Sequence, residues 1–328
     1  MKSSFLAALL ALVMITPAFA LEKTTLSYVT WNADFGYIMA AVDKGYFIEE
    51  GLDVELVAAG GGVAIPAMIS NSLDFSGSGS TAISAILKGA KLKVLMVGQD
   101  RSGWQLWSQN PQLKELADLK DQQIGVISRG DSGEIAMRYL LMKHNLPSNY
   151  VAYTPLGNGT GRLAAISTGA IPANLMVWGE VEKLKTQGSL AGAHLISNLT
   201  TEFRMVFNGL ASSDRMIHDQ PDTVLKMVRA LMKGQTYVRS FRDQSVAMMA
   251  RYSKSEEKDA ASDYDHILPA IARDGTVDAS VRANEVSLRS EMLDIPSSST
   301  MKAQDVFDFL PAREALEELT NEGWKPTP

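Results

Sequence analysis

Short apolar runs separated by glycine, proline and polar turn residues recur along the chain, and they predict buried strands that alternate with helices. The stretch 44–86 shows this pattern most clearly. An apolar, β-branched run at 53–58 predicts a buried strand, and the glycine triplet at 60–62 allows the backbone to turn sharply after it. Beyond the triplet we expect a helix over 64–70, a very short strand over 73–75 and a helix over 82–87.

The same alternation continues towards the C-terminus and predicts an α/β protein. At 223–241 apolar residues recur at helical spacing, which indicates a long amphipathic helix whose Met and Leu stripe faces the core. A polar, helix-like turn is expected at 111–120. Further strands are expected at 26–29, 91–97, 104–108, 123–127, 173–177 and 204–210, and further helices at 38–43, 134–143 and within 305–319.

An internal repeat with an offset of 98 residues relates the two halves of this pattern. Residues 57–61 fall on 155–159, and residues 70–74 fall on 168–172. Each copy contains a strand, a glycine-bearing loop, a helix rich in Ala and Ile, and a short second strand. The repeat therefore predicts two similar lobes that face each other across a cleft.

The repeat also suggests how the chain is divided between the lobes. We expect lobe 1 to contain 21–106 and 209–328, and lobe 2 to contain 107–208. The chain would then cross between the lobes near 105–122 and near 202–212, which gives a hinge of two strands. Hinge closure around a ligand is a common motion of such architectures.

The first 20 residues have the organisation of a secretory signal peptide. Lys2 provides a positive charge, 5–15 is apolar, and Ala18 and Ala20 are the small residues that a signal peptidase requires. A membrane anchor is the alternative, but a run of roughly 11 apolar residues is short beside the roughly 20 that span a bilayer. We expect cleavage after Ala20 and export to the periplasm.

Composition disfavours several classes of function. The chain carries 31 Lys and Arg against 37 Asp and Glu, so its surface does not favour nucleic acid or an anionic membrane. It has no Cys, which excludes disulfides, Cys zinc sites and thiol nucleophiles. The four His lack the spacing of a helical zinc pair, and neither a phosphate-binding P-loop nor a G-x-S-x-G motif is present. We expect no catalytic residues, no metal and no cofactor.

Candidate ligand contacts lie in loops that follow predicted strands, because ligands of open α/β sheets bind beyond the carboxyl ends of the strands. Helix N-termini at these loops would favour an anion, which Arg129 could clamp with two hydrogen bonds. The candidates are Trp31, Asn32, Phe35, Gly61, Gly62, Ser78, Gly79, Ser80, Thr81, Ser128, Arg129, Gly130, Asp131, Ser132, Asn158, Gly159, Trp178 and Glu180.

Each candidate also has a structural interpretation. Trp31 or Phe35 could cover the core, and Asp131 could cap the helix that follows it. Arg129 could be a solvated surface residue, and Glu180 could simply start the next helix. The sequence leaves these alternatives open.

Four segments, in order, resemble the nitrate/sulfonate/taurine cluster of periplasmic solute-binding proteins, which serve ABC importers: GYFIEEGLDVELV, the GGG loop, AMISNSLDFSGSGST and LADLKDQQIGV. The resemblance extends from about Leu26 to the C-terminus and implies a type II periplasmic-binding-protein fold with two three-layer lobes. Two positions depart from the family pattern: Asn71 stands where Gly is more usual, and Pro172 where Asp is more usual.

The resemblance implies a receptor that captures a small organic anion by hinge closure and delivers it to the permease subunits of an importer, which work with a cytoplasmic ATPase. The aromatic candidates suggest that the ligand has an apolar or planar part. We expect a monomer. A Cys-free enzyme on the same fold and a sensor component for a membrane kinase are the alternatives.

Overall fold

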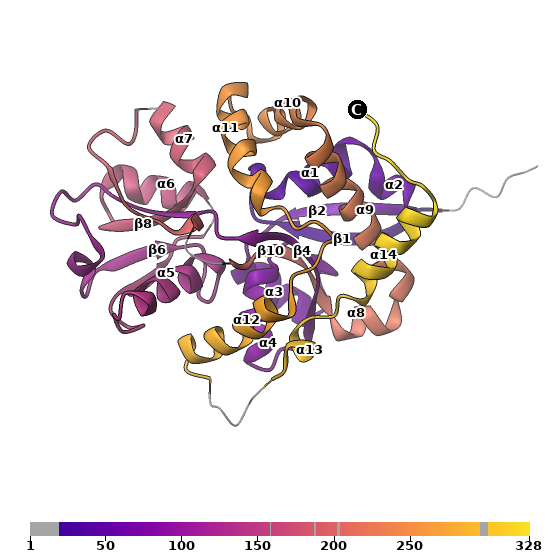
Figure 1. Ribbon diagram of the computed structural model, residues 1–328, viewed down its shortest axis with the longest axis horizontal. Helices are drawn as coiled ribbons and strands as arrows, with labels where there is room; N and C mark the ends of the chain where they lie inside the picture. The colour runs from indigo at the N-terminus through magenta and orange to yellow at the C-terminus, as the bar shows by residue number, and fades with distance from the viewer. Residues whose placement is uncertain (1–19, 158, 187, 202–203, 296–300) are drawn as a thin grey trace, which may run out of the picture.

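The protein consists of two lobes, each built on a five-stranded mixed sheet with helices packed around it (Figure 1). The computed structural model describes residues 20–157, 159–186, 188–201, 204–295 and 301–328. Apart from Ala20, the expected signal peptide lies outside these residues. No helix in the described ranges has both the length and the apolar character needed to cross a bilayer.

The first sheet has the strand order β2-β1-β3-β10-β4. β1 pairs in parallel with β2 and β3, whereas β10 is antiparallel to both of its neighbours. The sheet therefore has a parallel part, at whose carboxyl ends the βα loops gather. Its strands are β1 (Glu22–Tyr28), β2 (Leu52–Ala58), β3 (Phe75–Ser76), β4 (Leu92–Arg101) and β10 (Arg204–Ser213).

The second sheet, of order β7-β6-β8-β5-β9, repeats this topology. β6 pairs in parallel with β7 and β8, and β5 is antiparallel to β8 and β9. β6, β7 and β8 thus occupy the places of β1, β2 and β3, as the offset of 98 residues predicts. Its strands are β5 (Trp104–Ser108), β6 (Gln123–Val126), β7 (Ala152–Pro155), β8 (Ala173–Val177) and β9 (His194–Asn198).

The two departures from the family pattern fit their positions in this repeat. Asn71 has a φ of 59°, and Gly169, its counterpart at the offset of 98, has a φ of 66°. Asn tolerates this left-handed conformation better than most other side chains, so it can replace Gly there. Pro172 lies just before β8, where it needs no ladder hydrogen bond, and its carbonyl accepts one from Ser108 Oγ at 2.6 Å.

The chain passes between the sheets twice, from β4 to β5 through 102–103, and from β9 towards β10 through the 3-10 helix η3 (Leu199–Thr201). β5 belongs to the second sheet over its whole length. The lobe boundaries expected from the sequence, 21–106 with 209–328 and 107–208, remain a prediction.

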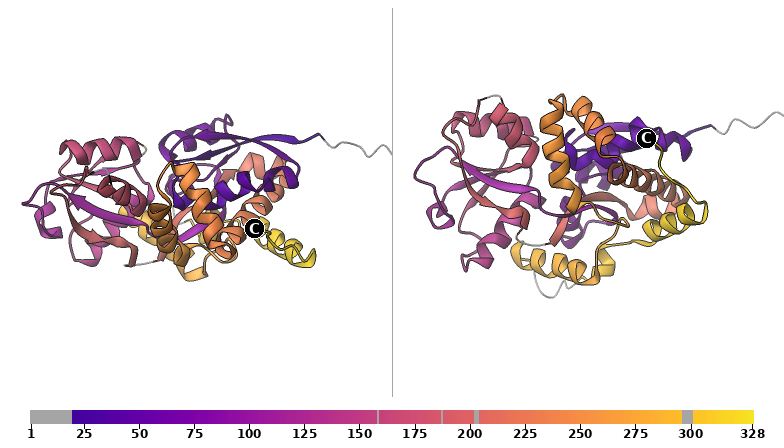
Figure 2. Two further views of the ribbon diagram at one scale, coloured as in Figure 1. Left: turned by 90° about the horizontal axis from the view of Figure 1, so that it is seen from above. Right: turned by 45° about the horizontal axis from the view of Figure 1, so that its top comes forward.

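Helices surround both sheets, and two of them lie at the junction of the lobes. α11 (Glu257–Ile267) packs against α7 (Trp178–Thr186), and α12 (Ala279–Met292) packs against α5 (Ser132–Lys143), as the views in Figure 2 show. The other helices are α1 (Gly36–Asp43), α2 (Tyr46–Glu49), α3 (Gly61–Ile69), α4 (Gly79–Leu87), α6 (Gly159–Thr168), α8 (Asp214–Asp219), α9 (Pro221–Ser240), α10 (Arg242–Ser253), α13 (Ala303–Val306) and α14 (Leu310–Asn321), with 3-10 helices η1 (Ala33–Phe35), η2 (Leu116–Leu119) and η4 (Leu268–Ala270).

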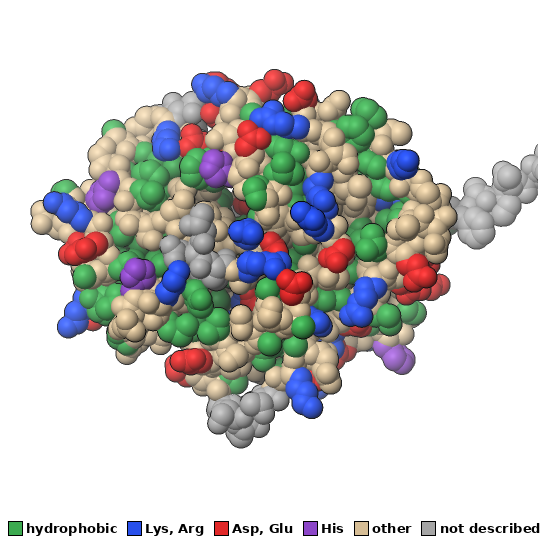
Figure 3. Space-filling model, viewed as in Figure 1, with side chains coloured by type: hydrophobic (Ala, Val, Ile, Leu, Met, Phe, Trp, Pro, Cys, Tyr) green, Lys and Arg blue, Asp and Glu red, His purple; other side chains and the backbone are tan. Residues whose placement is uncertain are grey.

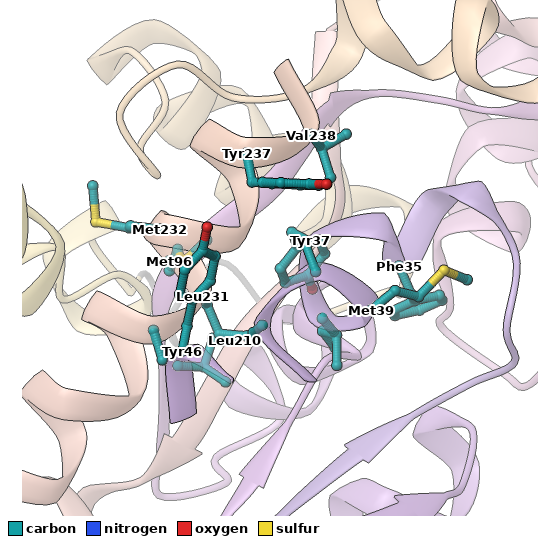
Figure 4. Close-up of a cluster of buried hydrophobic side chains, with 14 of the residues drawn as sticks. Phe35, Tyr37, Met39, Tyr46, Met96, Leu210, Leu231, Met232, Tyr237 and Val238 are labelled. Atoms are coloured by element: carbon teal, nitrogen blue, oxygen red, sulfur yellow. The ribbon is translucent and has the colours of Figure 1, made fainter. Parts of the chain in front are cut away.

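The largest core cluster fills the space between the first sheet and the helices α1, α9 and α14 (Figure 4). The apolar stripe predicted over 223–241 is buried there, with Val228, Leu231 and Met232 in contact with this cluster. Tyr37 of α1 and Tyr237 of α9 belong to the same cluster. The prediction that this stripe is core is therefore confirmed.

The glycine triplet lies at a helix start rather than in a free loop. Gly60 is the N-cap of α3, and Gly61 and Gly62 form its first turn, three residues before the expected start at 64. A Cβ at Gly61 would overlap the side chain of Thr81. The missing side chain therefore lets the first turns of α3 and α4 approach each other.

The close contact between α1 and α9 generates a stability prediction. A Cβ at Gly234 of α9 would overlap the carbonyl oxygen of Tyr37, so the Gly234→Ala variant has to move a backbone. We expect a loss of about 1–3 kcal/mol in the free energy of unfolding, measured by urea titration. Gly36→Ala is the matched control, because its Cβ would meet only the flexible end of Met249 and should cost less. An unchanged urea midpoint for Gly234→Ala would contradict the close packing of the two helices.

Candidate functional site

A cavity of about 50 Å³ lies between the lobes, where loops at the carboxyl ends of the parallel strands converge. We call it the inner cavity. Assigned by sheet, with β10 in lobe 1 and β5 in the facing lobe, lobe 1 contributes Val29, Thr30, Asn32, Asp34, Phe35, Gly61, Gly77, Ser78, Ser80, Thr81, Phe207 and Asn208. The facing lobe contributes Trp104, Ile127, Asp131, Ser132, Arg162, Val177 and Glu180.

Half of the residues proposed from the sequence line this cavity: Asn32, Phe35, Gly61, Ser78, Ser80, Thr81, Asp131, Ser132 and Glu180. They come from the loops after β1, β3, β6 and β8 and from the first turn of α3. The rule that ligands bind at the carboxyl ends of strands therefore located the region. A binding role for each residue remains a prediction.

Other candidates lie elsewhere. Trp31 stacks on Tyr28 with ring centroids 3.8 Å apart and packs against the largest core cluster, as its structural interpretation suggested. Trp178 lies at a second hollow described below. Gly159 is the first residue of α6, and Asn158 lies outside the described residues.

Four of the remaining candidates, Gly62, Gly79, Ser128 and Gly130, lie at close contacts between the lobes or between neighbouring elements. A Cβ at Gly62 would stand 3.1 Å from that of Ser128, and one at Gly79 would stand 2.9 Å from the Gly209 carbonyl oxygen. Gly130 accepts a hydrogen bond from Ser84 across the cleft. These residues permit close approach of the backbone.

Arg129, expected to clamp an anion, points away from the inner cavity into an ion pair. Its Nε and Nη2 each donate to a Glu134 carboxylate oxygen at 2.9 Å, and its side chain is 57% exposed. Glu134, five residues along the chain on α5, thus competes successfully for the guanidinium.

Arg162 of α6 is the cation among the described lining residues, and the sequence analysis did not single it out. It is 2% exposed, and its Nη2 pairs with Glu180 Oε1. Its guanidinium lies 5.2 Å from the ring centroid of Trp104. Its position in the first turn of the helix after the second glycine loop was the available signal.

The carboxylates of Asp131 and Glu180 accept backbone hydrogen bonds at the starts of α5 and α7. Asp131 caps α5 by accepting from Glu134 N at 2.8 Å, and its other oxygen accepts from Ile127 N at 2.9 Å. Burial raises the pKa of Asp131, and the backbone hydrogen bonds from Glu134 and Ser128 oppose that effect. Glu180 Oε2 accepts from Val177 N at 3.2 Å while Oε1 holds Arg162. Both structural interpretations from the sequence therefore apply, although both residues line the cavity.

Asp34 is the least compensated acid of the site, and the sequence analysis passed over it. It is buried in η1, and its Oδ2 accepts from Asn32 Nδ2 at 2.9 Å. Burial raises the pKa of Asp34 to about 7, and the charge of Glu180 adds to this shift. Hydrogen bonds from Gln99 and Asn32 and the charge of Arg162 act in the opposite direction.

A second hollow, the outer hollow, adjoins the inner cavity and shares Asn32 and Asp34 with it. It measures about 330 Å³. Trp178 lines it and stacks on His266 with ring centroids 3.5 Å apart. Burial and the nearby charge of Asp34 raise the pKa of Asp263 at this hollow to about 8.

Several buried polar atoms of cavity-lining residues have no hydrogen-bond partner within the described chain: Asn32 Oδ1, Ser78 Oγ, Arg162 Nε and Asn208 Oδ1. Phe35, Trp104 and Phe207 supply apolar walls beside them. A few convergent polar groups set among aromatic side chains are typical of a small-molecule site. No group of three or more Asp, Glu or His able to hold a metal occurs among the residues described.

A family model described as NMT1/THI5 like matches residues 32–243, which include all the lining residues of the inner cavity except Val29 and Thr30. The chain belongs to the NMT1/THI5-like family. One similar protein is the riboflavin-binding protein RibY of Chloroflexus aurantiacus, 25% identical over 224 residues. That match covers 65% of this chain and 62% of RibY, so it spans less than two thirds of the relative's length.

Solved structures show that this NMT1/THI5-like chain has the periplasmic-binding-protein fold. The alkanesulfonate-binding protein SsuA from Xanthomonas axonopodis pv. citri, bound to MOPS, matches with a TM-score of 0.72 at 18% identity, over 87% of this chain and 98% of its own. The periplasmic nitrate-binding protein NrtA from Synechocystis PCC 6803 gives 0.73 at 14% identity, over 91% and 89%. The family resemblance and the α/β two-lobed fold expected from the sequence are thereby confirmed.

The same fold also occurs in the desulfurization enzyme DSZB, with a TM-score of 0.56 at 13% identity, over 90% of this chain and 99% of its own. Likeness at this level of identity shows the fold alone. The function of this NMT1/THI5-like protein has to be argued from its own site.

The raised pKa values of Asp34 and Asp263 predict how the free energy of unfolding depends on pH. Between the ordinary Asp value of 3.8 and about 7, folded Asp34 retains a proton that the unfolded chain has released. Stability should therefore fall as pH rises through this interval, by up to about 1.4 kcal/mol per pH unit for each such carboxyl, and level off above it. For Asp263 the fall extends to about pH 8.

Urea unfolding of the NMT1/THI5-like protein between about pH 4 and pH 9 measures this dependence. Asp34→Asn and Asp263→Asn should each flatten the fall, whereas Asp53→Asn at an exposed position of β2 should leave it unchanged. A slope unaffected by Asp34→Asn would show that Asp34 does not hold its proton in the folded state.

Proposed function

We propose that this protein is an extracytoplasmic substrate-binding protein of an ABC importer, which captures a small solute between its lobes and delivers it to the permease. The observation that carries the proposal is the inner cavity, which both lobes line and whose lining residues include buried polar atoms without partners in the described chain. The fold shared with the sulfonate-binding and nitrate-binding proteins supports it.

The mechanism is capture by closure. The lobes contact each other on both sides of the inner cavity, with Ser84 Oγ donating to Gly130 O at 2.6 Å and Trp178 Nε1 donating to Ser262 Oγ at 3.1 Å. A solute that supplies partners to the cavity atoms of both lobes binds this closed form better than an open one. Such a difference in affinity shifts the population towards the closed form.

The charges of the cavity favour an uncharged planar solute with hydrogen-bonding groups along its edge. Arg162 is committed to Glu180, and Asp34 lies nearby with a carboxyl that is half protonated near neutral pH. An anion would therefore meet acids and a guanidinium that is already paired. Riboflavin, the ligand in the name of the relative RibY, has an uncharged planar ring system and would need both the inner cavity of about 50 Å³ and the outer hollow of about 330 Å³; it is the first compound to test.

An organic anion, the class expected from the sequence, is the second candidate. The first turns of α3, α4, α5 and α7 reach the inner cavity, and N-terminal helix dipoles favour negative charge. Alkanesulfonate and nitrate are the ligands named for SsuA and NrtA. The position of Arg129 outside the cavity removes the clamp on which this expectation partly depended.

We propose binding without a chemical step. The described residues that line the inner cavity include no His, Lys or Cys, so the Ser–His, Cys–His and Ser–Lys pairs of nucleophilic catalysis do not occur among them. Incubation with any ligand found below, followed by mass spectrometry of the solute, tests this point. Turnover would move the assignment to an enzyme such as the desulfurization relative.

A thermal-shift screen of the refolded protein tests the proposal. We expect the largest shift from riboflavin or a smaller uncharged heterocycle, and smaller shifts from alkanesulfonates, aromatic carboxylates and nitrate. A ligand at about 100 times its Kd adds about 2.7 kcal/mol to the stability of the folded state. A dominant shift with one anion class would replace the uncharged ligand by an anion, and no shift with any compound would contradict the receptor function.

A pair of aromatic variants tests the location of the site. Phe35→Ala removes a wall of the inner cavity and should weaken binding of the ligand found in the screen by about tenfold or more. Trp31→Ala is the matched control, because this ring lies in the same loop but packs on Tyr28. Isothermal titration should show its Kd unchanged. Equal loss of affinity in the two variants would place the ligand elsewhere.

A further inference from the structure

Helix α12 joins the two lobes below the inner cavity. It follows the 3-10 helix η4 in the chain and packs against α4 and β10 of lobe 1 and against α5 of the facing lobe (Figure 1). Its inward side carries Arg289, which is fully buried. A buried guanidinium is tolerated only when its donors are paired, so the partners of Arg289 show what it holds in place.

Arg289 holds the wall of the inner cavity. Its Nη1 donates to Ser80 O at 2.8 Å, and its Nη2 donates to Ser80 Oγ at 2.8 Å. Its Nε pairs with Glu285, whose other oxygen accepts from Val206 N of β10 at 2.6 Å. Both oxygens of Ser80, a lining residue of the cavity, are thus connected to β10 through Arg289 and Glu285.

The same guanidinium reaches a contact between the lobes. Arg289 Nη1 also donates to Ser84 Oγ at 3.0 Å, one turn along α4 from Ser80. Ser84 Oγ in turn donates to Gly130 O of the facing lobe at 2.6 Å. A hydroxyl has one proton and two lone pairs, so a lone pair occupied by Arg289 directs the proton towards Gly130.

The acceptor is fixed equally well on its own side. Gly130 has a φ of 75°, a conformation that favours glycine, and its N–H donates to the buried Glu134 at 2.7 Å. A Cβ at Gly130 would stand 3.0 Å from the Cβ of Ser84, so the missing side chain lets the carbonyl approach the hydroxyl. The donor, Ser84 Oγ, and the acceptor, Gly130 O, are therefore each oriented by contacts within their own lobe.

We infer that Arg289 is a positioning residue for lobe closure, which orients the Ser84 hydroxyl to bond Gly130 of the facing lobe and ties this latch to Ser80 in the cavity wall. The inference rests on the proposed capture by closure. According to this inference, the hydrogen bond between Ser84 and Gly130 stabilises the closed form in addition to the solute. Part of the free-energy difference between the closed and open forms is therefore present without ligand.

Electron paramagnetic resonance distance measurements on the ligand-free protein test the latch. The chain has no Cys, so Lys88→Cys and Lys120→Cys, at exposed positions in the two lobes, accept spin labels without competing sites. In the labelled parent we expect a substantial closed population. Ser84→Ala should lower the ratio of closed to open molecules by about fivefold, the usual effect of one such hydrogen bond.

Matched variants separate positioning from general stability. Ser212→Ala removes a buried hydroxyl that donates to Asp74 O at 2.7 Å within lobe 1, so it should leave the distance distribution unchanged. Arg289→Lys keeps the charge but loses the forked geometry, and should shift the ratio in the same direction as Ser84→Ala. Added to Ser84→Ala it should shift the ratio no further, because both changes act through the same hydroxyl.

Three results would overturn the latch: an exclusively open parent, an unchanged distribution in Ser84→Ala, or an Arg289→Lys effect of equal size with and without Ser84. Thermal unfolding of each variant identifies any that fails to fold, and Ser84→Ala alone then decides. Because no ligand is added, a failed ligand screen leaves this result intact, and a failed latch leaves ligand capture intact.

Discussion

The burial of charged and polar side chains where the two lobes meet is the constraint on which the structure depends. Arg162 and Arg289 are almost completely buried, and each is matched by an acid, Glu180 and Glu285 respectively. Removal of one partner would leave an uncompensated charge in a medium of low dielectric constant, which is strongly destabilising. The pairs therefore fix how the helices that carry them approach the cleft.

This constraint also explains why most polar groups of the cleft are unavailable to a ligand. Asp131 accepts a hydrogen bond from the first turn of α5, and Ser132 Oγ accepts one from Trp104 Nε1 at 3.0 Å. One oxygen of Glu180 pairs with Arg162, and the other accepts from the N–H of Val177, just before α7. What remains are a few atoms of Asn32, Ser78 and Arg162, together with the partly protonated Asp34. Selectivity then depends on these few atoms and on the shape of the aromatic walls. The charged surface of the molecule, where both signs are interspersed in the view of Figure 3, contributes little to it.

The sequence predicted the fold well because the relevant signals are local and periodic. The offset of 98 residues aligned β1, β2 and β3 with β6, β7 and β8, and half of the site residues proposed from the loops that follow these strands line the inner cavity. The direction of individual side chains was not predictable in this way. Trp31 and Phe35 lie in one loop, yet Trp31 stacks on Tyr28 and packs against the core, whereas Phe35 belongs to the core and also lines the cavity. Arg129 forms an ion pair with Glu134 outside the cavity, whereas Arg162 forms one with Glu180 at the cavity wall. Tertiary packing determines which acid each arginine meets.

The place of β10 in the first sheet has a consequence for the order in which the protein folds. All five strands of the second sheet lie within 104–198, whereas the first sheet places β10 between β3 and β4, although more than half of the chain precedes it. Contacts between segments so far apart form slowly, because a long loop must close before they are made. The second lobe can thus assemble from a continuous stretch of chain while the first sheet still lacks an inner strand. An unfinished sheet exposes unpaired backbone groups, so during synthesis or refolding we expect lobe 1 to be the part that aggregates, recruits chaperones, or remains extended the longest.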